Sequence, residues 1–192
     1  MSNNLIRCFI AISLPQEILD QIGLYLQELK EISPRVRWVK PAAIHITLKF
    51  LAEQSEKVVI SIEKELTGLG EVCPPFELSV AGAGCFPNRN RPRVFWLGLE
   101  HDTKNSLFKL HEWIDKHLEP LGFEREKRRF SPHLTLGRVK EPSDHQNIFD
   151  HFAKNPFPIS KFTVQEVVFM QSELRPEGAK YTPIGKYFLK GL

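Results

Sequence analysis

Two short stretches of the chain share one pattern of residue types, and this pattern constrains the fold more than any other feature. Both read His-aliphatic-Thr-Leu, one beginning at His45 and the other at His133. Successive side chains of a β-strand point to opposite faces, so His45 shares a face with Thr47. His133 shares a face with Thr135 for the same reason. Each stretch is therefore predicted to be a strand that buries aliphatic side chains and presents one imidazole and one hydroxyl.

Composition alone does not account for this repetition. With 7 His and 42% hydrophobic residues, two such matches are expected in about one chain in a thousand. A single copy would be interpreted as a histidine on the wet face of an edge strand, with threonine present for its β-propensity. Two copies, 88 residues apart (133 − 45), indicate a shared site instead.

Length and composition are typical of a globular protein. The 192 residues predict one domain or two small interlocked lobes with a substantial core. A net charge of +3 is too weak by itself to argue for nucleic acid. The 3 Cys have no metal-site spacing, which favours a reducing, cytoplasmic compartment. No signal-peptide pattern and no run long enough to cross a bilayer is found, so no membrane association is expected.

The remaining chain alternates predicted helices and strands. Aliphatic residues at helical spacing predict helices near 13–32, 55–70, 102–122 and 143–152. Apolar or alternating runs predict strands near 7–12, 37–39, 44–51, 76–80, 94–99, 133–138, 162–170 and 181–189, with a loop at 82–92. We therefore expect an α+β fold of two lobes related by a pseudo-twofold. Antiparallel-rich sheets would face a central cleft, with the helices outside and one histidine strand in each lobe.

Two histidines across a cleft can transfer protons from both sides. Histidine is the side chain whose ordinary pKa lies between pH 5 and 8, so one ring can take a proton from water while the other gives one to a leaving oxygen. The hydroxyls of Thr47 and Thr135 can donate hydrogen bonds to an anion held between the strands. Phosphate suits this arrangement, because in-line displacement needs an acid and a base on opposite sides. On this reasoning the two histidines are interchangeable.

Other catalytic sites fit the sequence less well. No Asp, Glu or Cys shares the histidine face in either stretch, whereas a divalent metal usually needs three or four such ligands. Neither a Gly-x-Ser-x-Gly turn nor a glycine-rich phosphate loop is present. We therefore expect no metal and no cofactor.

The two motifs and their flanks resemble a known family. The stretches that carry the resemblance are Arg7-x-Phe-Ile-Ala-Ile, His45-Ile-Thr-Leu-Lys-Phe-Leu, Arg93-Val-Phe-Trp-Leu-Gly, Pro132-His-Leu-Thr-Leu-Gly-Arg and Ser172-x-Leu-x-Pro-x-Gly-x-x-Tyr181. They resemble the 2H phosphoesterase superfamily with its two H-x-T-x signatures. Within it they resemble the RNA 2′,3′-cyclic phosphodiesterases, also called 2′-5′ RNA ligase-like proteins. The resemblance implies that residues 1–192 form a single domain of two interlocked lobes.

This resemblance implies a metal-independent hydrolase that opens a 2′,3′-cyclic phosphate at an RNA end to a 2′-phosphomonoester. It implies that His45 donates a proton to the leaving oxygen and that His133 accepts one from water. Thr47 and Thr135 would hold the phosphate. The expected partner is RNA with a cyclic phosphate end, with tRNA fragments among the candidates, and the protein is expected to be a monomer.

Two further positions match family residues that contact substrate. Phe50 matches an aromatic residue that can stack on a nucleobase, and Arg138 matches a basic residue that can pair with phosphate. Each lies five residues after its histidine, so strict alternation would place it on the opposite face. They reach the cleft only if each strand ends or bulges first, and Gly137 would permit a bulge before Arg138.

Several alternatives remain open from the sequence. The loop with Arg89, Arg91 and Arg93 would either guide the RNA backbone or be a solvated loop. The substrate could instead be a small cyclic nucleotide or ADP-ribose cyclic phosphate, or the reaction could be 2′-5′ RNA ligation. A non-catalytic nucleotide or RNA-end binding module is the alternative from another class, although such a module would tolerate the loss of a histidine or threonine and this chain keeps both pairs.

Overall fold

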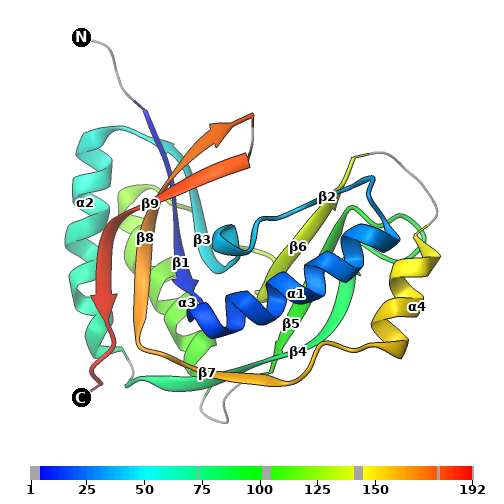
Figure 1. Cartoon of the computed structure of the whole chain (residues 1–192). Coiled ribbons are helices and arrows are strands. Elements are labelled where there is room, and N and C mark those ends of the chain that lie inside the picture. Colours follow the sequence, from blue (N-terminus) through cyan, green and yellow to red (C-terminus); the bar gives the residue numbers. More distant parts are fainter. Residues whose placement is uncertain (1–4, 73, 101–104, 141–144, 177, 192) are drawn as a thin grey trace.

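The computed structural model describes residues 5–72, 74–100, 105–140, 145–176 and 178–191. In these residues one antiparallel sheet has the strand order β7-β4-β5-β6-β3-β1-β8-β9, and β2 also pairs with β6 (Figure 1). The α-helices α1 to α4 accompany it. The predicted α+β class with antiparallel strands is confirmed. None of the described helices has the length and apolar character needed to span a membrane.

The strands and helices have the following bounds. The strands are β1 (Ile6–Ser13), β2 (Val36–Trp38), β3 (His45–Gln54), β4 (Phe76–Phe86), β5 (Val94–Glu100), β6 (His133–Val139), β7 (Ser160–Val164), β8 (Glu166–Arg175) and β9 (Gly178–Phe188). The α-helices are α1 (Gln16–Ile32), α2 (Glu56–Leu66), α3 (Ser106–Leu118) and α4 (Gln146–Lys154). Short 3₁₀ turns are η1 (Pro41–Ala43), η2 (Thr67–Glu71) and η3 (Glu119–Leu121).

Helices α1 and α3 bury the aliphatic residues whose helical spacing predicted them. In α1 the stripe of Ile18, Ile22, Leu26 and Leu29 is buried, and in α3 the corresponding residues are Leu107, Leu110, Ile114 and Leu118. Helix α1 packs against α4, and α2 packs against α3. The sheet meets these stripes with the aliphatic side chains of the histidine strands, including the fully buried Ile46 and Leu134. This burial leaves the opposite face of β3 and β6 for polar side chains.

The two histidine strands meet at a single pair of residues. We expected a sheet in each lobe, the two facing each other; in the structure β3 and β6 are neighbours in one curled sheet, paired at Ile46 and Leu134. Beyond this pair β2 lies along β6, with Trp38 opposite Gly137. A Cβ atom on Gly137 would lie 2.7 Å from the Trp38 ring, so the glycine permits this close approach.

Two sequence predictions of strand bounds need correction. The predicted loop at 82–92 begins too early, because β4 continues to Phe86. Gly82 has φ of 71° and the β4–β5 register shifts between Val80 and Ala83, so a bulge absorbs the glycine and the strand resumes. The predicted strand at 162–170 belongs to two strands, β7 and β8, which pair with different neighbours, β4 and β1.

Candidate active site

The histidine motifs lie side by side at the junction of the two halves. Ile46 of β3 pairs with Leu134 of β6, and both point into the core. In antiparallel geometry the flanking positions on the other face are His45 beside Thr135 and Thr47 beside His133. The structure therefore brings the four motif residues to one face of the sheet, as the alternation predicts.

Both imidazoles are anchored in the same way. Nδ1 of His45 lies 2.9 Å from the carbonyl oxygen of Ala43, and Nδ1 of His133 lies 2.8 Å from that of Ser131. A carbonyl oxygen can only accept a hydrogen bond, so Nδ1 of each ring carries the proton and donates. This leaves Nε2 of each ring as the nitrogen that can accept a proton when the ring is neutral and donate one when it is charged.

The surroundings of the two rings differ. The His45 ring lies 4.7 Å from the Phe9 ring and 5.1 Å, edge to face, from the Tyr181 ring, measured between centroids. His133 meets Phe86 edge to face at 5.0 Å. Burial lowers the pKa of His45, its hydrogen bond to Ala43 opposes that shift, and the charge of His133 lowers the pKa further. The charge of His133 therefore affects the protonation of His45, as expected of two neighbouring groups that transfer protons.

An open cleft of about 810 Å³ runs along this face. Its lining includes His45, Thr47, Thr135, Phe50 and Arg138. His133 is not among the lining residues, although Thr135, two positions along the same strand, is. The cleft wall is completed by the β8–β9 hairpin, which contributes Ser172, Leu174, Pro176, Gly178, Ala179 and Tyr181.

Bulges bring Phe50 and Arg138 to the cleft face. In β3 the partner of Ile10 is Lys49 and the partner of Ala11 is Thr47, so Leu48 is an extra residue in the ladder. Alternation restarts after it, and Phe50 returns to the face of Thr47. In β6 the register shifts between Phe95 and Trp96, which returns Arg138 to the face of Thr135 in the same way.

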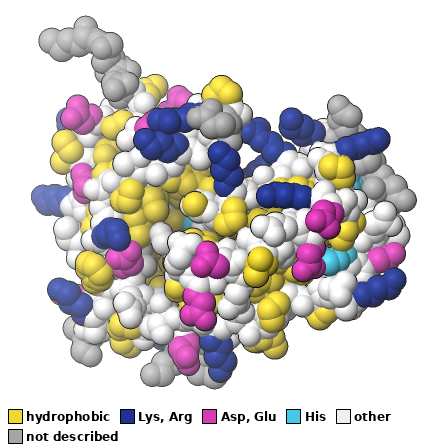
Figure 2. Space-filling view, in the orientation of Figure 1, with side chains coloured by type: hydrophobic (Ala, Val, Ile, Leu, Met, Phe, Trp, Pro, Cys, Tyr) yellow, Lys and Arg dark blue, Asp and Glu magenta, His cyan; other side chains and the backbone are white. Residues whose placement is uncertain are grey.

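The cleft is cationic. Its lining includes Arg7, Arg37, Lys40, Arg138 and Lys140, and no Asp or Glu is found among the described lining residues. Figure 2 shows Lys and Arg side chains gathered across the upper middle and right of this view, the region where Figure 1 places β2 and β6. Charge of one sign in a concave surface concentrates the field and attracts anions.

Tyr181 lies between charges from both halves. Burial raises the pKa of its hydroxyl, and the positive charges of Arg138 and Arg7 oppose that shift. The Arg7 guanidinium also lies 4.5 Å above the centre of the exposed Phe50 ring. Of these residues, Arg7, Phe9 and Tyr181 were given no role by the sequence reasoning, although the first and last stretches of the resemblance contain them.

The arginine loop lies elsewhere. Arg89, Arg91 and Arg93 do not line the cleft, and the Arg89 guanidinium lies 5.2 Å from the centre of the Phe149 ring of α4. If this loop guides the RNA backbone, it does so outside the cleft.

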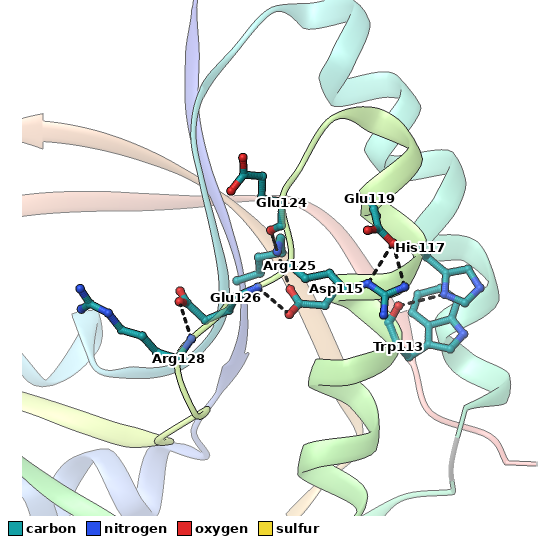
Figure 3. Close-up of polar contacts among 9 residues, drawn as sticks. Trp113, Asp115, His117, Glu119, Glu124, Arg125, Glu126 and Arg128 are labelled. Atoms are coloured by element: carbon teal, nitrogen blue, oxygen red, sulfur yellow. Dashed lines mark hydrogen bonds and ion pairs between the residues drawn. The ribbon is translucent and has the colours of Figure 1, made fainter.

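Polar contacts behind the cleft hold the loop that leads into β6. Asp115 of α3 accepts hydrogen bonds from the Lys49 ammonium and, at 3.1 Å, from the backbone N–H of Glu126. Lys49 also donates to the Glu124 carbonyl at 3.0 Å. Figure 3 shows the Asp115 carboxylate pointing from α3 toward this loop, while Arg125 binds Glu119 beside it. The loop ends at Ser131, whose carbonyl orients His133.

The described side chains contain no cluster of three or more His, Cys, Asp or Glu positioned to hold a metal ion. At and beside the cleft, the described residues offer two imidazoles with free Nε2 atoms, two hydroxyls and several cations. This arrangement suits the binding of a phosphate ester and proton transfer to or from its oxygens.

Comparison with known proteins agrees with this interpretation. Residues 18–175 match the model of the 2′-5′ RNA ligase superfamily. The chain belongs to this superfamily. A superfamily relative from Methanothermobacter thermautotrophicus, called RNA 2′,3′-cyclic phosphodiesterase, is 34% identical over 178 residues, which cover 92% of this chain and 95% of the relative. A protein of the same name from Thermotoga maritima is 33% identical, with 91% of each chain covered.

Solved structures show the same fold. A crystal structure of a Thermus thermophilus protein superposes with a TM-score of 0.80 at 26% identity, covering 97% of this chain and 99% of that one. The crystal structure of E. coli LigT complexed with 3′-AMP has a TM-score of 0.77 at 26% identity, with the same coverage. The superfamily fold therefore extends over nearly the whole chain.

Proposed function

We propose that this protein hydrolyses RNA 2′,3′-cyclic phosphate ends to 2′-phosphomonoesters by a two-histidine acid/base mechanism without a metal. The observation that carries the proposal is the matched pair of imidazoles. On neighbouring strands, each ring has its Nδ1 held by the carbonyl of the residue two positions earlier. The names of the relatives, RNA 2′,3′-cyclic phosphodiesterase, support the same reaction.

In the proposed reaction a water oxygen attacks phosphorus in line with the 3′ oxygen. Nε2 of His133 takes the proton of the water, and the protonated Nε2 of His45 gives a proton to the 3′ oxygen as its bond to phosphorus breaks. The hydroxyls of Thr47 and Thr135 donate hydrogen bonds to the non-bridging oxygens. The anchors are equivalent in the two histidines, so the donor and acceptor assignment rests on the family resemblance.

The lowered pKa of His45 has a consequence for its role as the acid. In the free protein burial favours the neutral ring, whereas a bound phosphate anion favours the charged ring. Substrate binding should therefore raise the pKa of His45 and prepare it to donate. We also propose that Arg138 pairs with phosphate and that Phe50 stacks on the terminal nucleobase, since both line the cleft.

The remaining parts of the proposal concern partners and compartment. We propose that tRNA fragments with cyclic phosphate ends are substrates and that the protein acts as a monomer. A reducing, cytoplasmic compartment is supported by Cys8 and Cys85, which are both free thiols.

The test is an assay on an RNA oligonucleotide with a 2′,3′-cyclic phosphate end, with the product phosphate position determined. Hydrolysis to the 2′-phosphate should continue in EDTA, and His45→Ala and His133→Ala should each lower kcat by about a hundredfold or more. The pH profile of kcat/KM should be bell-shaped, and its acidic limb should lie below pH 6.5, because the lower of the two pKa values sets that limb and burial lowers the pKa of His45. The profile of kcat should lie at higher pH, since bound phosphate raises the pKa of His45.

Other outcomes would select an alternative. Loss of activity in EDTA would restore a metal mechanism. Faster turnover of cyclic mononucleotides or ADP-ribose cyclic phosphate would change the substrate class, and joining of RNA ends would indicate 2′-5′ ligation. Binding without turnover in the wild-type protein would indicate a binding module.

A further inference from the structure

We propose that β2 and the end of β6 form a second anion site, which binds phosphodiester groups of the RNA chain on the 5′ side of the reactive end. We call this site the cationic wall; it consists of Arg37, Lys40 and Lys140, and it adjoins Arg138. The inference rests on the proposed function, and it predicts that oligonucleotides are preferred over cyclic mononucleotides.

A pair of like charges marks the wall. Arg37 of β2 is the register partner of Arg138 of β6, and residues directly opposite on neighbouring strands have Cβ atoms about 5 Å apart. Like charges in this position destabilise a sheet. The unfavourable pair is understandable if an anion lies between the two guanidinium groups, since each can hold a phosphate through two N–H donors.

The charges of the wall are not neutralised by neighbouring acids. Within the described part of the chain, none of Arg37, Lys40 and Lys140 takes part in an ion pair, and no described acid lines the cleft beside them. By contrast, Arg125 and Lys186 on other surfaces have carboxylate partners within 3 Å. A cationic surface that lacks internal partners is available to an external anion.

The backbone under the wall is firmly seated. Trp38 donates from Nε1 to the Ser33 carbonyl at 2.9 Å, and its ring stacks on Phe95. The N–H of Val39 donates to the Leu136 carbonyl at 2.8 Å. Gly137 allows β2 to lie this close. The backbone at Arg37 and Lys40 is thus fixed relative to β6, so both side chains extend from fixed points before a ligand arrives.

The wall lies farther along β6 than the motif residues. Arg138 comes five positions after His133, which corresponds to roughly 16 Å of strand. Lys140 lies two positions farther from the histidines. A cyclic mononucleotide at the histidines has no second phosphate to offer the wall, whereas an RNA chain carries one at each following nucleotide. The wall therefore distinguishes substrates by their length.

The experiment compares Arg37→Ala/Lys140→Ala with the wild type on two substrates. One is a four-nucleotide RNA ending in a 2′,3′-cyclic phosphate, and the other is the corresponding cyclic mononucleotide. We expect kcat/KM to fall at least tenfold on the RNA and to stay within about twofold on the mononucleotide. The control is Lys57→Ala/Lys161→Ala, which removes the same charge from exposed positions outside the cleft and should affect neither substrate.

A binding measurement tests the wall without turnover. Fluorescence anisotropy gives the Kd of an RNA with a 2′-phosphate end at several salt concentrations. Each lost phosphate contact to single-stranded nucleic acid should reduce the slope of log K against log salt by about 0.7. We expect a reduction of about 1.4 for Arg37→Ala/Lys140→Ala and none for the control.

The outcomes separate this inference from the proposed function. If Arg37→Ala/Lys140→Ala lowers kcat/KM equally on the RNA and the mononucleotide, or leaves the salt slope unchanged, the cationic wall is not an RNA site. The hydrolase proposal would still stand. An equally large loss on ADP-ribose cyclic phosphate would show that the wall binds a diphosphate of a small molecule, which also overturns the inference. If no substrate is hydrolysed, the hydrolase proposal fails. The salt slope still decides whether the cationic wall binds RNA phosphates.

Discussion

At the scale of single residues, the two histidines share their anchors but not their surroundings. Each Nδ1 is held by a carbonyl two residues earlier, yet His45 packs between Phe9 and Tyr181 while His133 meets only Phe86 among the aromatic contacts of the described chain. The sequence repeat predicts two equivalent rings. The aromatic neighbours come from strands far away in the chain, so the repeat could not reveal this asymmetry.

The coupling of the two rings can be measured by NMR titration of the imidazole resonances. We expect the pKa of His45 to lie below 6.5, because burial disfavours its charged form. His133→Ala should raise that pKa, since the charge of His133 no longer opposes protonation. His117→Ala, which removes a ring of α3 that stacks on Trp113, should leave it unchanged. A His45 pKa that does not respond to His133→Ala would mean that the rings are too far apart to act on one phosphorus.

Phe50 offers a second test at this scale. Its side chain is 51% exposed and lines the cleft, so Phe50→Ala should cost little stability. Loss of base stacking, worth about 1–3 kcal/mol, should raise KM by roughly tenfold. Phe188→Ala is the matched control, because Phe188 is 58% exposed and does not line the cleft. Steady-state kinetics on the cyclic-phosphate RNA would show equal KM values for the two variants if Phe50 had no role in binding.

At the scale of elements, bulges decide which side chains reach the cleft. Helical spacing of aliphatic residues predicted α1 and α3, and the structure buries those aliphatic residues, because an uninterrupted period carries that information. The bulge at Leu48 has no such signal, since the extra residue is an ordinary aliphatic one. Only Gly137 in β6 indicated a possible bulge, and this bulge would place Arg138 on the cleft face, where the structure has it. Strand alternation therefore fails at the residues that complete the site.

The bulge in β3 also turns Lys49 toward α3, where it forms a buried pair with Asp115. Both side chains are only 9% exposed. Lys49→Met should destabilise the protein by about 3 kcal/mol or more, because it leaves the Asp115 carboxylate buried without its cation. Adding Asp115→Leu should recover much of this loss. The measurement is chemical denaturation followed by circular dichroism.

The control for this pair is Lys127→Met. Lys127 faces Glu124 at 3.8 Å with 88% of its side chain exposed, so its loss should cost less than about 1 kcal/mol. If Lys49→Met were as mild as Lys127→Met, the pair would not secure the loop that leads to His133.

At the scale of the whole molecule, one sheet carries residues from both halves to one cleft. The order of elements predicted the α+β class and placed one histidine strand in each half. It did not reveal that β3 and β6 are neighbours, because pairing between strands so far apart leaves no local pattern. The cationic wall escaped notice for a related reason: its charges come from residues 37–40 and 138–140, and only the β2–β6 pairing unites them.

The bulge in β3 changes the sequence offset at which two residues share a face of the strand. Phe50 lies on the same side of the strand as His45 although it comes five positions later, an odd offset; the same holds for His133 and Arg138. In an unkinked ribbon only even offsets keep two groups together. In a related chain whose imidazole and aromatic ring are both shown to bind substrate, an odd offset between them therefore indicates that the bulge is present, and an even offset indicates that it is missing.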